Sequence, residues 1–159
     1  MKKISILILL FLIAGFSAHA QKQKVTIDDD TIKVDGHPYG IIEKKNGLST
    51  DYTVKSLDGN EQIFFKFLEY NDPNEVNSGN RQGRVTYFQV SFFNSGGKCE
   101  IGVPATKKAV AKSIVENGLI KDNAVDPDAE KKYILINGTR FSQRRNQLAG
   151  PKVIIIDNH

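Results

Sequence analysis

The chain of 159 residues has the length of a single domain, and its formal net charge is only +4, from 22 basic and 18 acidic side chains. These charges alternate in sign along most of the chain and form no basic stripe, which argues against nucleic acid as a partner. Cys99 is the only cysteine, which excludes an internal disulfide. Beyond residue 20 only His37 and His159 could join it, too few ligands for a zinc site without carboxylates.

Residues 1–20 have the order of a cleavable bacterial signal peptide. Two lysines precede a short apolar run, and Ala18-His19-Ala20 has the small residues that signal peptidase recognises. The run is shorter than the about 20 residues that cross a bilayer, and the junction has no cysteine to carry a lipid, so no stable membrane anchor is expected. Cleavage near Ala20/Gln21 predicts a periplasmic or secreted protein. Residues 21–159 then form a single α+β domain with a formal net charge of +2.

Alternating polar and apolar residues, separated by turn sequences, predict about seven antiparallel strands in the first two thirds of the chain. Asp58-Gly59-Asn60 is a turn sequence of the kind that closes a hairpin. The strand after it, 61–70, is apolar on both faces, which predicts a central position in the sheet. The predicted strands are 24–28, 31–35, 39–43, 51–57, 61–70, 84–93 and 98–103.

The pattern becomes helical after Pro104. Apolar residues at Val110, Ile114 and Val115 recur with a period of 3.6 residues, which predicts a helix over 106–117. Gly118 follows where a glycine commonly ends a helix.

A second helix is predicted to open at Asp126-Pro127, because Asp is a favoured N-cap and Pro is favoured in the first turn. The competing interpretation is a hairpin over 133–141 with Asn137-Gly138 as its turn. We favour the helix because of its cap residues. The residues expected on its apolar face are Ala129, Tyr133, Ile134 and Ile136.

A last short strand is predicted at 151–157, where an apolar run follows Pro151. Together these elements predict an α+β fold. We expect a mostly antiparallel twisted sheet or half-barrel of about seven to eight strands, with a C-terminal helical pair packed on it.

Few residues are suited to catalysis, and no cofactor is predicted. The chain has no G-x-S-x-G elbow, and Cys99 lies in the middle of a predicted strand, where burial makes a thiol inert. The acidic turn at 28–30 lacks the spacing of a calcium loop, so no metal site is predicted. A small hydrolase that uses the strand carboxylates Glu69 and Glu100 is kept as an alternative.

Two polar segments supply the candidate binding residues. The loop 71–83 is long for a hairpin connection and includes Asn74 and Arg81. Its composition suits hydrogen bonding to sugar hydroxyls or to another protein, although plain flexibility is slightly favoured. Three arginines within six residues could bind an anion through their guanidinium forks. The favoured alternative for that segment is a solvated connection whose arginines pair with helix carboxylates. These arginines are Arg140, Arg144 and Arg145.

Overall the chain resembles small exported proteins of Bacteroidota-type bacteria, a resemblance of pattern that implies no function. It is carried by the Ala20/Gln21 junction and by the stretches 52–60, 115–122 and 141–145. The residues therefore favour a non-enzymatic binding or interaction module in the periplasm or outside the cell. Its partner would be an unidentified protein or a small polar ligand. The second alternative, beside the hydrolase, is a structural component of an envelope complex.

Overall fold

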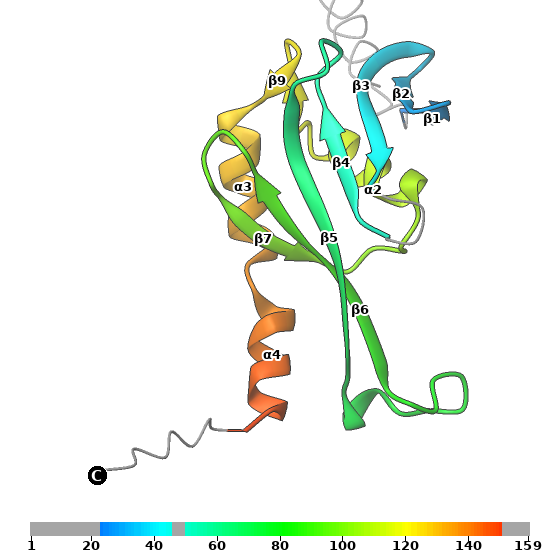
Figure 1. Cartoon of the computed structure of the whole chain (residues 1–159), viewed down its shortest axis with the longest axis vertical. Helices are drawn as coiled ribbons and strands as arrows, with labels where there is room; N and C mark the ends of the chain where they lie inside the picture. The colour runs from blue at the N-terminus through cyan, green and yellow to red at the C-terminus, as the bar shows by residue number, and fades with distance from the viewer. Residues whose placement is uncertain (1–22, 46–49, 151–159) are drawn as a thin grey trace, which may run out of the picture.

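The computed structural model describes residues 23–45 and 50–150. The predicted signal peptide and the predicted last strand lie outside these described residues. Within them, seven strands pair in chain order into one antiparallel sheet (Figure 1). The strands are β1 (Val25–Asp28), β2 (Thr31–Val34), β3 (His37–Lys44), β4 (Tyr52–Lys55), β5 (Glu61–Asn71), β6 (Arg84–Phe92) and β7 (Lys98–Ile101).

The helices follow the sheet in the chain, which confirms the predicted α+β class. The sheet is open and does not close into a barrel. No helix of the described part is long and apolar enough to cross a membrane. The remaining elements are the 3-10 turn η1 (Pro73–Glu75), α2 (Lys107–Glu116), the small hairpin β8 (Ile120–Lys121) and β9 (Ala124–Val125), α3 (Pro127–Asn137) and α4 (Arg140–Leu148).

The hydrophobic core lies between one face of the sheet and α2. Because side chains alternate across a strand, Ile63 and Phe65 share the face of their cross-strand partners on β6, Phe92 and Val90. All four are buried. Four buried residues of α2 pack into the same core, at the positions that the helical period predicted. They are Val110, Ala111, Ile114 and Val115.

The caps of α2 and α3 follow the sequence. The Thr106 side chain accepts a hydrogen bond from Ala109 N at 3.2 Å, and Gly118 adopts a positive φ of 60° just beyond the helix. The Asp126 side chain accepts from the first-turn N–H groups of α3 at 2.8 and 3.0 Å. The helix at 127–137 is therefore confirmed over the hairpin.

The expected apolar face of α3 is wrong at one position. Tyr133 is buried and meets Phe92 edge to face, with ring centroids 6.3 Å apart. Ile136, in contrast, is 66% exposed, and its neighbour Leu135 is 83% exposed. The reason is helical geometry. Ile136 lies three residues from Tyr133, but the side of α3 that contacts β7 is narrow, and Ile136 lies outside it.

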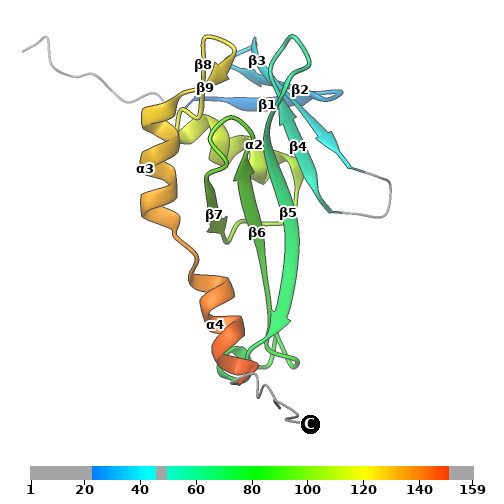
Figure 2. The same ribbon diagram turned by 60° about the vertical axis from the view of Figure 1, so that its left-hand side comes forward.

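Strands β5 and β6 are much longer than their neighbours. They pair from Ile63↔Phe92 as far as Asn71↔Arg84. Strand β4 pairs with β5 only as far as Phe65, and β7 pairs with β6 only from Phe88 onward. The far half of this two-stranded ribbon therefore projects beyond the sheet, and Figure 2 shows α4 running beside it.

Candidate functional site

Helix α4 is capped by a residue from another element. Thr139, at the N-cap position, makes no side-chain hydrogen bond to the helix. Instead Oε2 of Glu100, on β7, accepts hydrogen bonds from Phe141 N at 2.9 Å and Ser142 N at 3.0 Å. A carboxylate satisfies the unpaired N–H groups at a helix start and suits its dipole. The buried Glu100 therefore fixes where α4 begins.

Aromatic rings then fix the first turn of α4 against the ribbon. Phe141 stacks on Tyr87 of β6, with ring centroids 5.0 Å apart and planes inclined by 12°. Tyr70 of β5 meets Tyr87 edge to face at 6.1 Å, and Arg145 donates to the Tyr87 hydroxyl at 3.2 Å. The approach is close, since a Cβ on Gly102 would lie 2.8 Å from the Phe141 ring. A larger residue than glycine at position 102 would push the ring away.

An ion pair fastens the second turn of α4. Arg144 donates from Nε to Asp72 Oδ2 at 2.6 Å and from Nη2 to Oδ1 at 2.9 Å, a two-pronged geometry. Asp72 is only 4% exposed and also accepts from Asn74 N at 2.9 Å, as the cap of η1. The Arg144 guanidinium, and then the Asn74 N–H, hold the pKa of Asp72 below its usual range.

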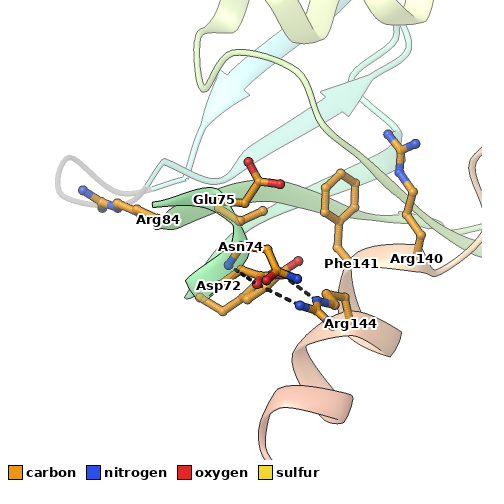
Figure 3. A pocket seen from close by; sticks show the side chains of 9 residues that line it. Asp72, Asn74, Glu75, Arg84, Arg140, Phe141 and Arg144 are labelled. Carbon is orange, nitrogen blue, oxygen red and sulfur yellow. Dashed lines mark hydrogen bonds and ion pairs between the residues drawn. The ribbon is translucent and has the colours of Figure 1, made fainter. Parts of the chain in front are cut away.

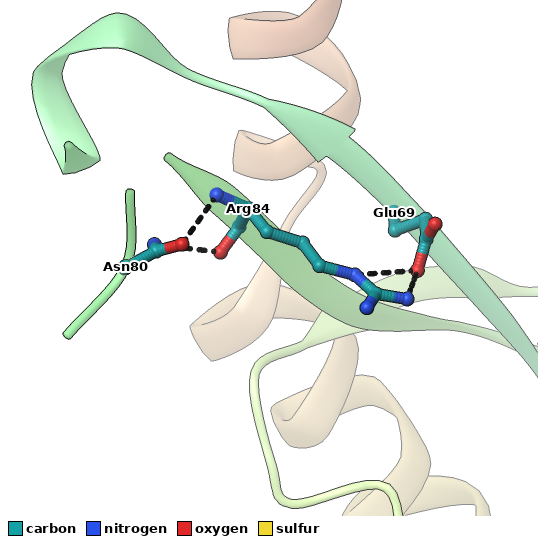
Figure 4. A network of polar contacts seen from close by, with 3 residues as sticks. All are labelled: Glu69, Asn80 and Arg84. Carbon is teal, nitrogen blue, oxygen red and sulfur yellow. Dashed lines mark hydrogen bonds and ion pairs between the residues drawn. The ribbon is translucent and has the colours of Figure 1, made fainter. Parts of the chain in front are cut away.

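The loop between β5 and β6 is ordered by its own polar side chains. Asn77 Oδ1 accepts from Gly79 N at 2.9 Å and from Asn80 N at 3.0 Å. Asn80 bonds both the N–H and the carbonyl of Arg84, whose guanidinium pairs with Glu69 (Figure 4). The amide groups that suggested binding or flexibility therefore largely stabilise the loop itself.

Gly83 closes the loop. It has a φ of +62°, and a Cβ there would lie 2.1 Å from the carbonyl oxygen of Asp72. Only glycine fits such a position without a shift of the backbone. Its carbonyl accepts from Asp72 N at 2.8 Å, which places Asp72 beside α4.

A cleft of about 540 Å³ opens between this loop and α4, and we call it the α4 cleft. Figure 3 shows the Phe141 ring between the Glu75 carboxylate and the Arg140 guanidinium in that view, with the Arg84 guanidinium pointing away. The lining residues are Tyr70, Asp72, Asn74, Glu75, Arg84, Val85, Arg140, Phe141 and Arg144.

Two charges of the α4 cleft carry no ion pair within the described part of the chain. Asp72 is paired with Arg144, and Arg84 is paired with Glu69. Arg140 instead lies over the Phe141 ring, with its Cζ 4.8 Å from the ring centroid. Glu75, in the first turn after Asp72, is exposed. The cleft therefore offers one cation and one anion to a ligand.

The structure brings together three of the five candidate residues from the sequence. Asn74, Arg140 and Arg144 line the α4 cleft, although they come from two distant segments. Arg145 lies outside the lining and contacts Tyr87, and Arg81 is exposed on the loop.

The prediction that the arginine segment is a connection is wrong, because 140–148 is helical. Its arginines were expected to pair with the carboxylates of the neighbouring predicted helix, but the partner of Arg144 is Asp72, which follows β5 and caps η1. Sequence reasoning also missed Tyr70, Asp72, Glu75 and Phe141 as site residues. The one local signal was the Asp72-Pro73 pair, which is typical of a capped turn.

The two strand carboxylates of the hydrolase alternative do not converge. Glu69 pairs with Thr86 and Glu100 with Gln89 across β6. Positions 86 and 89 are an odd number of residues apart, so they lie on opposite faces of the sheet. Glu69 and Glu100 therefore cannot flank one substrate bond.

The other chemically interesting residues have structural surroundings. Cys99 is buried in the core, and burial raises the pKa of its thiol to about 12. Two residues of the acidic turn carry lysine partners, with Asp28 2.6 Å from Lys33 Nζ and Asp30 paired with Lys107. In the described ranges, no three histidine, cysteine or acidic residues gather in a geometry that could hold a metal ion.

Comparison with protein-family models, with curated proteins and with solved structures finds no match. The function must therefore be argued from the residues of the chain itself.

Proposed function

We propose that this protein is an exported binding module and that the α4 cleft is its contact site. The observation that carries the proposal is the convergence, around one cavity of about 540 Å³, of an arginine and a glutamate without ion pairs in the described part of the chain. Ligand sites are typically concave and apolar, with a few polar groups placed to orient the ligand. Export rests on the order of residues in the sequence 1–20.

The lining residues suit recognition better than catalysis. The nine residues include no serine, threonine, cysteine, histidine or lysine. A nucleophile beside a base is the usual arrangement for covalent catalysis. What the cleft supplies instead is guanidinium forks, carboxylates and aromatic surface, which are groups that bind polar ligands.

The test is a set of NMR titrations of the isotope-labelled, exported protein with alanine, alanyl-phenylalanine, glucose, galacturonate and inorganic phosphate. At least one of these probes should shift the backbone amides of Tyr70, Asn74 and Phe141. The substitution Phe141→Ala should abolish those shifts, because it removes the ring beneath Arg140. The control is Arg81→Gln, which lies on the same loop as Asn74 but outside the cleft. Titrations in which every probe leaves the cleft amides unmoved would overturn the proposal.

A second function, as a component of an envelope complex, is favoured by the outer face of α3. Leu135 and Ile136 are 83% and 66% exposed. Lys131 and Lys132 precede them by one helical turn and carry no ion pair in the part of the chain that the structure describes. These lysines and exposed apolar side chains together fit a partner protein segment in which acidic side chains lie beside apolar ones.

The complex can be tested by native gel electrophoresis of envelope extracts. If α3 is a docking face, the double substitution Leu135→Ser and Ile136→Ser should move the protein from a large species to its monomer position. Val76→Ser, which changes another exposed apolar residue at 54% exposure, is the control. A single species unaffected by the double substitution would contradict a docking role. Sedimentation of the purified protein as a dimer would point to a second copy as the occupant.

A further inference from the structure

Three arginines line the α4 cleft, and the two on α4 are held by contacts within the protein before a ligand arrives. Arg144 is fixed by its two hydrogen bonds to the buried Asp72, and Arg140 lies over the Phe141 ring. Residues four apart on a helix lie on the same face, and both side chains line the cleft. Groups that are already ordered lose little conformational freedom on binding, which favours affinity.

Both guanidinium groups keep hydrogen-bond donors for a ligand. A guanidinium carries five N–H donors, and Asp72 uses one on Nε and one on Nη2 of Arg144. Arg140 makes no hydrogen bond through its guanidinium within the described residues. A carboxylate takes two parallel N–H bonds from such a fork. The α4 side of the cleft is therefore suited to a carboxylate end.

The opposite wall of the cleft carries the reverse charge. Asp72 is neutralised by Arg144, and Arg84 by Glu69, so Glu75 remains as the negative charge of the lining. In the view of Figure 3 it lies on the other side of the Phe141 ring from Arg140. A ligand with negative charge alone would be attracted by Arg140 but repelled by Glu75, and for a cation alone the two effects are reversed. A ligand with one charge of each sign satisfies both walls.

Apolar surface lies between these charges. The same cavity is lined by Phe141, Tyr70 and Val85. The rings of Phe141 and Tyr70 both contact the ring of Tyr87. A ligand that joins a carboxylate and an ammonium through an apolar side chain would use all three kinds of surface.

From this arrangement we propose that the α4 cleft binds a short zwitterionic peptide. Its carboxylate would bind Arg140 and the remaining edge of Arg144, its ammonium would bind Glu75, and an apolar side chain would pack on Phe141. The volume of about 540 Å³ is within the range of small-ligand pockets. This assignment of the ligand rests on the proposed binding function of the cleft.

The test compares three probes by NMR titration of the exported protein: alanyl-phenylalanine, its N-acetyl form and its C-terminal amide. The free dipeptide should shift the amides of Asn74, Glu75 and Phe141. It should bind about tenfold more tightly than either blocked form, because each block removes one charge-assisted hydrogen-bonded contact.

Two substitutions assign each end of the ligand. Arg140→Gln should reduce the preference for the free dipeptide over the amide, because only Arg144 then remains to bind the carboxylate, while the preference over the N-acetyl form persists. Glu75→Gln should do the reverse. Arg81→Gln, outside the cleft, should preserve both preferences. It thereby separates effects of the cleft residues from general effects of a substitution.

The outcomes separate the ligand class from the binding function. Equal affinity for the three peptides, or cleft shifts from galacturonate or phosphate but none from peptides, would overturn the zwitterion while the cleft remained a binding site. Peptide binding that neither Arg140→Gln nor Glu75→Gln changes would also overturn it. An absence of cleft shifts with every probe would overturn both proposals.

Discussion

Helices α2 and α4 are attached to the same sheet by different kinds of contact. Four residues of α2 are buried in the core, whereas none of α4 is buried. Helix α4 is held by the cap from Glu100, the stack on Tyr87 and the ion pair with Asp72. Burying an apolar side chain contributes more to stability than a typical polar contact, so we expect the packing of α2 to contribute more to the stability of the fold than the attachment of α4. Beside α4 the structure has a cleft lined by polar and charged groups.

The largest effect is expected from Ile114→Ala on α2. Ile114 is fully buried, and removing its side chain leaves a cavity in the core. The free energy of unfolding should fall by about 2–5 kcal/mol, measured by chemical denaturation. Its counterpart on α4, Leu148→Ala, should change stability by far less, since Leu148 is 37% exposed. Similar losses of unfolding free energy for the two variants would contradict the distinction between α2 and α4.

A smaller effect is expected from Glu100→Ala, which deletes the cap of α4. The loss should be about 1–2 kcal/mol, because two N–H groups lose their acceptor. Hydrogen exchange should speed up first at Phe141 and Ser142, whose backbone N–H groups donate hydrogen bonds to Glu100.

The matched control is Thr106→Ala, which deletes the side-chain cap of α2 and should leave exchange in α4 unchanged. Fast exchange of α4 amides in the control as well would mean that the two helices unfold together.

The ion pair between Asp72 and Arg144 should make the attachment of α4 sensitive to acid. The folded pKa of Asp72 lies below its ordinary value of 3.8, so this contact stabilises the native state above that value. The stabilisation is lost as the pH falls through the lower, folded pKa. Asp72→Asn should therefore loosen α4 at pH 7 yet match the wild type at strongly acidic pH.

Thermal denaturation of both proteins from pH 7 to pH 2 checks this prediction. A stability difference that stays constant over the whole pH range would contradict the role given to Asp72.

The smallest effect is expected from Arg84→Ala. Its guanidinium and the Glu69 carboxylate are 54% and 49% exposed, and exposed pairs contribute less than about 1 kcal/mol. The hydrogen bonds of Asn80 to the Arg84 backbone should survive the change and keep the loop ordered. Urea denaturation gives the stability, and a loss well above 1 kcal/mol would show that the pair supports the ribbon.

The same difference between the two ends decides what the sequence could predict. The strands, α2 and α3 are encoded by local signals: apolar alternation, the Asp58-Gly59 turn and the caps at Thr106 and Asp126. Such signals depend on neighbours in the chain, so a single sequence reveals them.

Helix α4 has no such signal. Its cap comes from Glu100, about forty residues earlier, and its ion-pair partner is Asp72, seventy-two residues away. Arg140 and Arg144 could be predicted as anion-binding candidates from residue type alone. The sequence contained no sign that η1 would face them, because that contact depends on how far β5 and β6 extend beyond their neighbours.

The order of the strands also bears on how the chain reaches its native state. Each of the seven strands pairs with the next one in the chain, so most pairings close short loops. Short closures cost little entropy, and folding rates rise as contacting residues come closer in the chain. We therefore expect the hairpins to form in succession. Helix α2 should pack on the sheet and complete the core once the strands have paired. Helix α4 contributes no buried side chain to the core, so its docking onto the ribbon should be the last step of folding.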